Sequence, residues 1–358
     1  MNTTNPETAA RAPGALAPSP LPPLLGVVIV NNSDAADTIE CLESLLRSAL
    51  PMKVVIVDNG SDGDSIDRLR AWAAGTLDAV PESSEMAAFS TPPVAKPLFL
   101  AELPEAAVGR PGVVASLTLI VSDAHQGLAG GNNLGLRHLL RDGQLKHFWL
   151  LGNDTVAAPD AAMGLLSRMM ATPRVGMCGT VVRQYWSPTR IEALNGSSYN
   201  KFTGKRRALG GGQPVTIKYS PQDVADATDC VLVTSIAVSR AFLSEVGPMA
   251  DDIPYFEEID WAVRNRNLGS LAFETAFAHG ATVFHKAGRS IGDSARAKRD
   301  APTDYGLARS RLRFTWRHYL WLWPLHWLIC WGQVLKRLAR RRGSNALAIM
   351  RAAFGRPY

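Results

Sequence analysis

Hydrophobic residues fall into short continuous runs that alternate with stretches of helical spacing. The runs at 24–30 and 53–57 are rich in Val and Ile, which is typical of strands buried on both faces of a parallel sheet. Between them, residues 37–50 carry apolar residues at helical spacing, with Asp37 or Thr38 as the N-cap. This unit predicts a right-handed crossover and a parallel sheet, in which ligands bind at the carboxyl ends of the strands.

The same pattern continues to about residue 285. It predicts strands at 117–121, 147–151, 175–178, 229–238 and 281–285 and helices at 134–140 and 161–170. Residues 75–116 lack a sustained period, so we expect an insertion that runs over the surface. Residues 1–23 are rich in Pro and Ala and predict a disordered tail. Residues 24–300 are therefore expected to form one α/β domain with a mostly parallel central sheet and flanking helices.

Charge is divided unevenly along the chain. Residues 1–285 hold 22 Lys and Arg against 29 Asp and Glu, whereas residues 286–358 hold 16 against 3. The second part also carries five of the nine tryptophans. A basic segment rich in Trp is typical of a protein that binds a membrane surface, so we expect that partner and not nucleic acid.

The end of the chain predicts a separate extension over residues 301–358. Within it, residues 319–335 carry no formal charge, but a run of 17 residues is at the lower limit for crossing about 30 Å of hydrocarbon. Lys and Arg residues flank both ends of this run. We therefore expect a basic, helical extension that associates with a membrane in its plane or as a re-entrant segment. A helix packed against the α/β domain is the alternative.

The composition also bears on the cellular compartment. The chain is 46% hydrophobic and 20% charged, which excludes a protein that is disordered throughout. Its four cysteines are far apart and include no C-x-x-C pair, so neither a zinc cluster nor a disulfide framework is indicated. The first apolar run is too short for a signal peptide. We expect a cytoplasmic protein at the inner face of the plasma membrane.

Polar residues follow several predicted strands. Asn31 and Asp58 end the first two, Asn153 and Asp154 follow 147–151, and His285 ends the last. Carboxylates at this edge of a parallel sheet usually face a ligand. A divalent metal bound to phosphates needs one or two protein carboxylates, and Asp154 suits that role. The alternatives are a turn residue for Asp154 and an ordinary core residue for His285.

Two further motifs carry candidate chemistry. The sequence GLAGGNN at 127–133 opens a helix and would present backbone N–H groups to an anion. In the acidic run at 251–260, Glu257 and Glu258 have apolar neighbours that would raise the pKa of a carboxylate toward the range of a general base. A solvated acidic face is the alternative for these glutamates.

Six segments occur together in one order between residues 24 and 315. They are VVIVNNSDAADTIECLESLL, VVIVDNGSDGDS, GLAGGNNLG, LLGNDT, YFEEIDWAVR and FHKAGRSIG. In this set and order the chain resembles the inverting family 2 glycosyltransferases of the GT-A fold, close to the rhamnosyltransferase-like branch. The resemblance implies a Rossmann-like α/β domain. It also implies transfer of a sugar, with rhamnose a candidate, from a dTDP- or UDP-sugar to a saccharide hydroxyl in cell-surface polysaccharide synthesis.

The resemblance also implies roles for individual residues. Asp154 would bind Mg²⁺ or Mn²⁺, with His285 completing the metal shell. Glu258 would be the catalytic base, with Glu257 and Asp260 orienting it or the acceptor. The implied donor-binding residues are Asn31, Asp58, Gly127, Gly130, Gly131, Asn132, Asn133 and Asn153. By family habit the acceptor would be lipid-linked, which would account for a membrane-associated extension.

Two positions depart from the family pattern, and two other functions are alternatives. Asn32 stands where an aromatic residue is common, and Glu258 stands where Asp is commoner. A catalytically silent GT-A scaffold that binds a glycolipid or a partner enzyme is the alternative to an enzyme, and the retained metal and base positions argue against it. A sugar nucleotidyltransferase is disfavoured because no Gly-rich loop with Arg or Lys follows the first strand.

Overall fold

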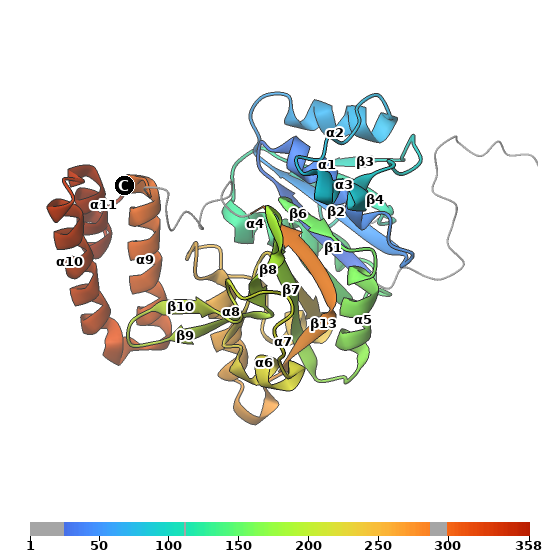
Figure 1. Cartoon of the computed structure of the whole chain (residues 1–358). Coiled ribbons are helices and arrows are strands. Elements are labelled where there is room, and N and C mark those ends of the chain that lie inside the picture. Colours follow the sequence, from blue (N-terminus) through green and yellow to red (C-terminus); the bar gives the residue numbers. More distant parts are fainter. Residues whose placement is uncertain (1–24, 111, 287–298) are drawn as a thin grey trace, which may run out of the picture.

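The computed structural model describes residues 25–110, 112–286 and 299–358, so the predicted tail at 1–23 lies outside the described residues. A ten-stranded sheet forms the centre of the molecule (Figure 1). Its strands are β1 (Leu25–Asn31), β2 (Met52–Asn59), β3 (Ala101–Pro104), β4 (Leu117–Ser122), β5 (His147–Gly152), β6 (Thr155–Ala157), β7 (Val175–Gln184), β8 (Ser187–Leu194), β12 (Ser235–Ser239) and β13 (Glu274–His285). A smaller sheet contains β9 (Gly196–Asn200), β10 (Lys205–Ala208) and β11 (Cys230–Val231).

Most neighbouring strands of the central sheet are parallel. Their order is β3-β4-β2-β1-β5-β12-β7-β13-β6, with β8 paired to β7. Strands β3, β4, β2, β1 and β5 are parallel to one another, and β13 is parallel to β7. Strand β12 is antiparallel to both of its neighbours, and β6 is antiparallel to β13. The prediction of an α/β domain with a mostly parallel sheet is confirmed.

Successive residues of a strand face opposite sides of the sheet, and a layer of helices covers each side. The helices of the domain are α1 (Ala35–Leu45), α2 (Ser65–Ala74), α3 (Ser84–Ser90), α4 (Gly127–Leu139), α5 (Ala161–Met170), α6 (Pro221–Ala227), α7 (Arg240–Glu245) and α8 (Glu257–Arg266). Val27 and Ile29 of β1 belong to the hydrophobic core under α1, α2 and α5. Val28, between them, belongs to the core under α4, α7 and α8. The continuous apolar runs in the sequence therefore reflect strands covered on both faces.

Several elements differ from the sequence prediction. Helix α1 ends at Leu45, and its N-cap is Asp34, whose carboxylate accepts a hydrogen bond from the backbone N–H of Asp37. The run at 229–238 is two strands, because the chain turns at residues 232–234 between β11 and β12. The segment 75–116 contains α3 and also β3, which extends the sheet beside β4 and so is more than a surface insertion.

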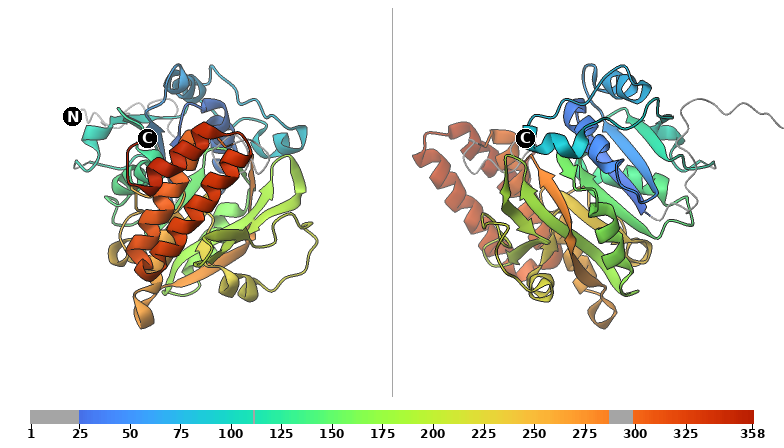
Figure 2. Two further views of the ribbon diagram at one scale, coloured as in Figure 1. Left: turned by 90° about the vertical axis from the view of Figure 1, so that its left-hand side faces the viewer. Right: turned by 45° about the vertical axis from the view of Figure 1, so that its right-hand side comes forward.

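The C-terminal extension consists of α9 (Ala301–His318), α10 (Trp323–Ala339) and α11 (Gly343–Ala353). Figure 2 shows α10 and α11 as an outer layer in the left view, and Figure 1 places α9 toward the domain. Phe314 of α9 is fully buried, with its ring 5.3 Å from that of Phe256 and 5.8 Å from that of Tyr199. Within the described residues, no helix combines the length and the apolar character needed to cross a membrane.

Candidate active site

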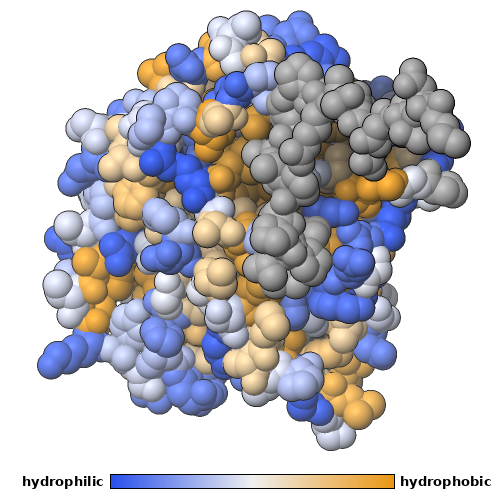
Figure 3. All heavy atoms as spheres, turned by 90° about the vertical axis from the view of Figure 1, so that its right-hand side faces the viewer, coloured by the Kyte–Doolittle hydropathy of each residue, from blue (hydrophilic) through white to orange (hydrophobic). Residues whose placement is uncertain are grey.

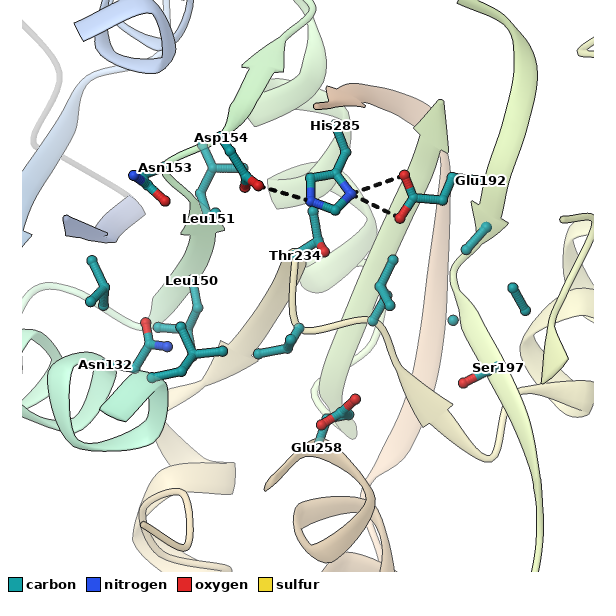
Figure 4. Close-up of a pocket in the computed structure, with 18 of the residues that line it drawn as sticks. Asn132, Leu150, Leu151, Asn153, Asp154, Glu192, Ser197, Thr234, Glu258 and His285 are labelled. Carbon is teal, nitrogen blue, oxygen red and sulfur yellow. Dashed lines mark hydrogen bonds and ion pairs between the residues drawn. The ribbon is translucent and has the colours of Figure 1, made fainter. Parts of the chain in front are cut away.

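A cavity of about 400 Å³ lies at the carboxyl edge of the central sheet. Strands β5 and β8, the β9–β10 hairpin and the start of α8 surround it, and α4 contributes to one wall (Figure 4). The polar side chains that line it belong to Asn132, Asn153, Asp154, Glu192, Ser197, Arg206, Thr234, Glu258 and His285. The cavity therefore collects residues from segments that are far apart in the sequence.

One wall of the cavity carries a row formed by Asp154, His285 and Glu192. The antiparallel pairing of β6 with β13 places Thr155 opposite His285 and so brings Asp154 next to the imidazole. His285 Nε2 lies 3.2 Å from Asp154 Oδ2, while His285 Nδ1 lies 2.8 and 2.9 Å from the two oxygens of Glu192 (Figure 4). Both ring nitrogens therefore face carboxylates, which fixes the orientation of the ring.

The row also controls the charge of His285. Burial alone would lower the pKa of this imidazole, but the hydrogen bonds to Asp154 and Glu192 raise it to about 10. The ring is therefore an imidazolium at neutral pH when the two carboxylates are its neighbours. A bound cation between Asp154 and Nε2 would take the place of that proton.

The donor set fits a divalent metal that arrives with a diphosphate. Asp154 offers a carboxylate and His285 an Nε2 atom on the same wall, and Glu192 holds the other ring nitrogen as carboxylates commonly do behind metal-binding histidines. No group of three or more His, Cys, Asp or Glu in the described part of the chain is arranged to hold an ion. A metal here would depend on phosphate oxygens and water for its remaining ligands.

Glu258 lies across the cavity from this row, at the start of α8 (Figure 4). Its carboxylate is buried and forms an ion pair with Arg206 of β10. The guanidinium also lines the cavity, so it holds the Glu258 carboxylate in place from the side of the hairpin. Of the three predicted acidic residues on α8, Glu258 is the one that faces the cavity.

Glu257 is buried but does not line the cavity. Burial, followed by the charge of Glu258, raises the pKa of Glu257 from about 4.5 to about 8. Glu257 is therefore protonated at neutral pH.

We expect Glu257→Gln to change the pH dependence of stability. Because folding raises the pKa of this group, the wild-type protein loses stability as the pH rises from about 4.5 to about 8, by at most roughly 1.4 kcal/mol per pH unit. The glutamine lacks this titration, so the stability of the variant relative to wild type should rise over that range. Urea unfolding at pH 5, 6.5 and 8 measures it, with exposed Glu245→Gln as the control. A difference that stays constant would contradict a protonated Glu257.

The structure places Asp260 away from the cavity, in contacts between α8 and α9. Its carboxylate lies 2.7 Å from Arg264 Nε, 2.7 Å from His318 Nε2 and 3.3 Å from Arg317 Nη1, and it is fully buried. These partners account for its position without a ligand. Asp260 therefore joins the extension to the domain.

Two groups can be distinguished among the predicted donor-binding residues Asn31, Asp58, Asn132 and Asn153. Asn132 and Asn153 line the cavity. Asn31 and Asp58 are buried beside it, where Asn31 Nδ2 donates to Asp58 Oδ1 at 2.7 Å and the backbone N–H of Ser61 donates to Asp58 Oδ2 at 3.1 Å. This network joins the ends of β1 and β2, so Asp58 stabilises the sheet edge in this structure.

The glycine-rich segment forms the first turns of α4. A Cβ atom on Gly131 would lie 2.8 Å from a methyl of Val30, so this glycine lets α4 pack closely on β1. Gly127 has a φ of +70° at the start of the helix, and Gly130 lies against Gln126. Asn133 exchanges two hydrogen bonds with the backbone of Met249, at 2.9 and 3.0 Å. Within this segment, Leu128 and Asn132 reach the cavity.

No family model matches the chain, and no curated protein has a matching sequence. Among solved structures, the mannosyltransferase PcManGT from Pyrobaculum calidifontis, in complex with GDP-Man and Mn²⁺, covers 94% of this chain and 87% of its own, with 13% identity and a TM-score of 0.48. GalNAc-T7, solved with UDP, GalNAc and Mn²⁺, has 11% identity and a TM-score of 0.51 and covers 80% of this chain. The match spans 47% of that transferase.

The chain therefore has a GT-A-like fold. Four polar residues of the cavity were not predicted from the sequence, namely Glu192, Ser197, Arg206 and Thr234. Glu192 and Arg206 lie on β8 and β10, whose sequences lack clear apolar alternation. Thr234 reaches the cavity because the chain turns between β11 and β12, and its carbonyl accepts a hydrogen bond from the Gly152 N–H at 2.8 Å. The charge of Glu192 and Arg206 was visible in the sequence, but their pairing was not.

Proposed function

We propose that the protein is an inverting glycosyltransferase that moves a sugar from a dTDP- or UDP-sugar to a hydroxyl of a saccharide acceptor. The main support is that one cavity has Asp154 and His285 at one end and Glu258 at the opposite end (Figure 4). Such a cavity has room to hold a donor diphosphate and an acceptor hydroxyl together. Rhamnose and a role in cell-surface polysaccharide synthesis belong to the proposal through the family resemblance.

In the proposed reaction, Glu258 takes the proton of the acceptor hydroxyl while the hydroxyl oxygen attacks the anomeric carbon of the donor sugar. The bond between that carbon and the donor phosphate oxygen breaks, and the nucleoside diphosphate leaves with the electron pair. Asp154 and His285 would hold Mg²⁺ or Mn²⁺, which when bound stabilises the negative charge of the leaving diphosphate. Arg206 holds the Glu258 carboxylate toward the acceptor. A single displacement inverts the configuration and needs no covalent enzyme intermediate.

We expect the protein to bind a nucleoside diphosphate sugar in a metal-dependent way. Binding to the native state raises the apparent melting temperature by mass action. A thermal-shift screen of dTDP-, UDP- and GDP-sugars, each with Mn²⁺ and with EDTA, measures this. The GalNAc-T7 structure, with UDP and Mn²⁺, supports the choice of ligands. The same melting temperature with every donor and metal would contradict the proposed function.

We further propose a lipid-linked acceptor and a place on the cytoplasmic face of the plasma membrane. Support comes from the exposed apolar side chains of α10 and of the residues before it, namely Leu320, Trp321, Leu325, Leu328, Leu335 and Leu338. Basic residues at 336–342 follow them and complement anionic lipids. On the opposite face of the molecule, hydrophobic and hydrophilic residues are interspersed (Figure 3).

Substitution of two exposed leucines is expected to weaken membrane binding. Leu328→Ser with Leu335→Ser removes apolar area from α10, where the two side chains are 60% and 66% exposed. Co-sedimentation with vesicles of phosphatidylglycerol and phosphatidylcholine should show a severalfold lower bound fraction, and high salt should lower wild-type binding as well. Val80→Ser with Leu271→Ser, two exposed positions of the α/β domain, is the control. Equal binding of both double variants would contradict this surface.

A further inference from the structure

A second cavity, of about 420 Å³, lies between the α/β domain and the extension. The tip of the β9–β10 hairpin, the residues before α8, and the helices α9 and α10 form its walls. Six of its lining residues are cationic: Lys205, Arg206, Arg299, Arg311, Lys336 and Arg337. Among the described residues that line it, Asp304 is the one carboxylate. We refer to it below as the basic cavity.

Internal ion pairs account for two of the six cations. Arg337 forms a bidentate pair with Asp304, through Nε at 2.6 Å and Nη2 at 2.7 Å. Arg206 pairs with Glu258. For the other four, the described residues provide no carboxylate partner within ion-pair distance. The basic cavity therefore holds an excess of positive charge that a multivalent anion would neutralise.

The position of Arg311 is built into the fold. Gly204, at the hairpin tip, has a φ of +63°, which favours glycine, and a Cβ atom there would lie 2.2 Å from Arg311 Nη1, so a larger residue would displace the guanidinium. Nη1 donates to the carbonyl of Thr203 at 2.9 Å. Burial lowers the pKa of Arg311, which means that its charge is held at a cost in this structure. An anion in the basic cavity would offset that cost.

The basic cavity adjoins the acceptor end of the candidate active site. Arg206 lines both cavities and contacts the Glu258 carboxylate from between them. An acceptor whose hydroxyl reaches Glu258 would therefore place its neighbouring groups beside Lys205, Arg311 and Lys336. The donor diphosphate, in contrast, is assigned to Asp154 and His285 on the far wall.

We propose that the basic cavity binds a phosphate or diphosphate group of the acceptor, attached close to the sugar that receives the transferred residue. That the anion belongs to an acceptor rests on the proposed function. The anion site itself follows from the charge and shape of the cavity. Phosphate fits because several Lys and Arg side chains converge without carboxylates to neutralise them. A lipid-borne and a soluble acceptor share this chemistry.

Isothermal titration calorimetry of inorganic pyrophosphate into the full chain tests the anion site. EDTA is present so that no metal holds a diphosphate at Asp154. Wild type should bind one pyrophosphate, and Lys205→Gln with Lys336→Gln should weaken binding roughly 10- to 100-fold. Both lysines are exposed at the cavity rim and form no ion pair with a described residue, so the substitutions leave the core intact. The matched control is Arg207→Gln with Arg340→Gln, which removes equal charge from β10 and from the residue that follows α10, both outside the cavity.

The outcomes separate this inference from the proposed function. Equal weakening in the two double variants, loss of binding in Asp154→Ala, or no binding by wild type would overturn the anion site. Donor binding plays no part in the metal-free titration, so a failed donor screen would leave its result unchanged. We expect farnesyl diphosphate to bind at least as tightly as pyrophosphate through the same lysines. A farnesyl diphosphate that does not compete with pyrophosphate would overturn a lipid-borne acceptor at this cavity.

Discussion

Replacement of Glu258 by Gln is expected to slow sugar transfer by roughly 10²- to 10⁴-fold while donor affinity stays unchanged. The amide keeps the size of the side chain but cannot accept the proton of the acceptor hydroxyl. Glu258 lies across the cavity from Asp154 and His285, so the metal-dependent binding of the donor does not involve it. Initial rates of transfer and calorimetric titration of the donor measure the two effects separately.

The matched variants for this prediction are Glu257→Gln and Asp260→Asn. Glu257 is buried outside the cavity, and Asp260 pairs with Arg264 and His318, so neither change should remove the base. A large loss of transfer in one of them, with Glu258→Gln close to wild type, would show that the base has been assigned to the wrong position of α8.

Replacement of Asp154 by Ala is expected to abolish the metal-dependent part of donor binding. Among the residues that the structure describes, Asp154 supplies the one carboxylate that faces both the cavity and His285 Nε2, and a hard divalent cation prefers oxygen ligands. Titration of a nucleoside diphosphate with and without Mn²⁺ measures the effect. The control is Asp123→Ala, an exposed carboxylate that follows β4 at the same edge of the sheet and does not line the cavity.

A stability measurement accompanies the Asp154 titration. The Asp154 carboxylate is buried, and its loss leaves Glu192 as the remaining carboxylate neighbour of His285 in the described residues. The variant must therefore be shown to unfold cooperatively before its affinity is compared with that of wild type. A folded Asp154→Ala protein that binds the diphosphate with Mn²⁺ as tightly as wild type would contradict the metal assignment.

The convergence of Asp154 and His285 was predictable from the sequence for a physical reason, whereas Glu258 lies at the start of α8 and was indicated by the family resemblance. Parallel strands end at one edge of a sheet, so polar residues that follow buried apolar runs meet there even when they are more than a hundred positions apart. The apolar runs themselves are unambiguous because the strands are covered on both faces. These features define most of the sheet and one wall of the cavity.

The roles of Asn31 and Asp58 could not be predicted in the same way. Their position at strand ends is common to residues that face a ligand and to residues that satisfy neighbouring polar groups. Here Asn31 donates to Asp58 and to the hydroxyls of Ser61 and Ser65, and such contacts depend on the packing of α1 and α2 against the sheet. Local sequence does not encode that packing.

Glu192 and Arg206 were missed because their elements have weak sequence signals. Strand β8 is irregularly paired with β7, and all four residues of β10 are exposed, so neither shows an apolar period. Their partners are His285 and Glu258, which lie 93 and 52 positions away along the chain. Electrostatic pairs at such separations depend on the completed fold.

The most direct test of the central claim is a ³¹P and ¹H NMR time course of a donor that the thermal-shift screen identifies, with Mn²⁺ and with water as the minimal acceptor. We expect wild type to release nucleoside diphosphate in a metal-dependent reaction, the sugar to appear first with the opposite anomeric configuration, and Glu258→Gln to be far slower. A donor that binds yet stays intact with both proteins would instead indicate a silent scaffold, and release with retained configuration would contradict single displacement.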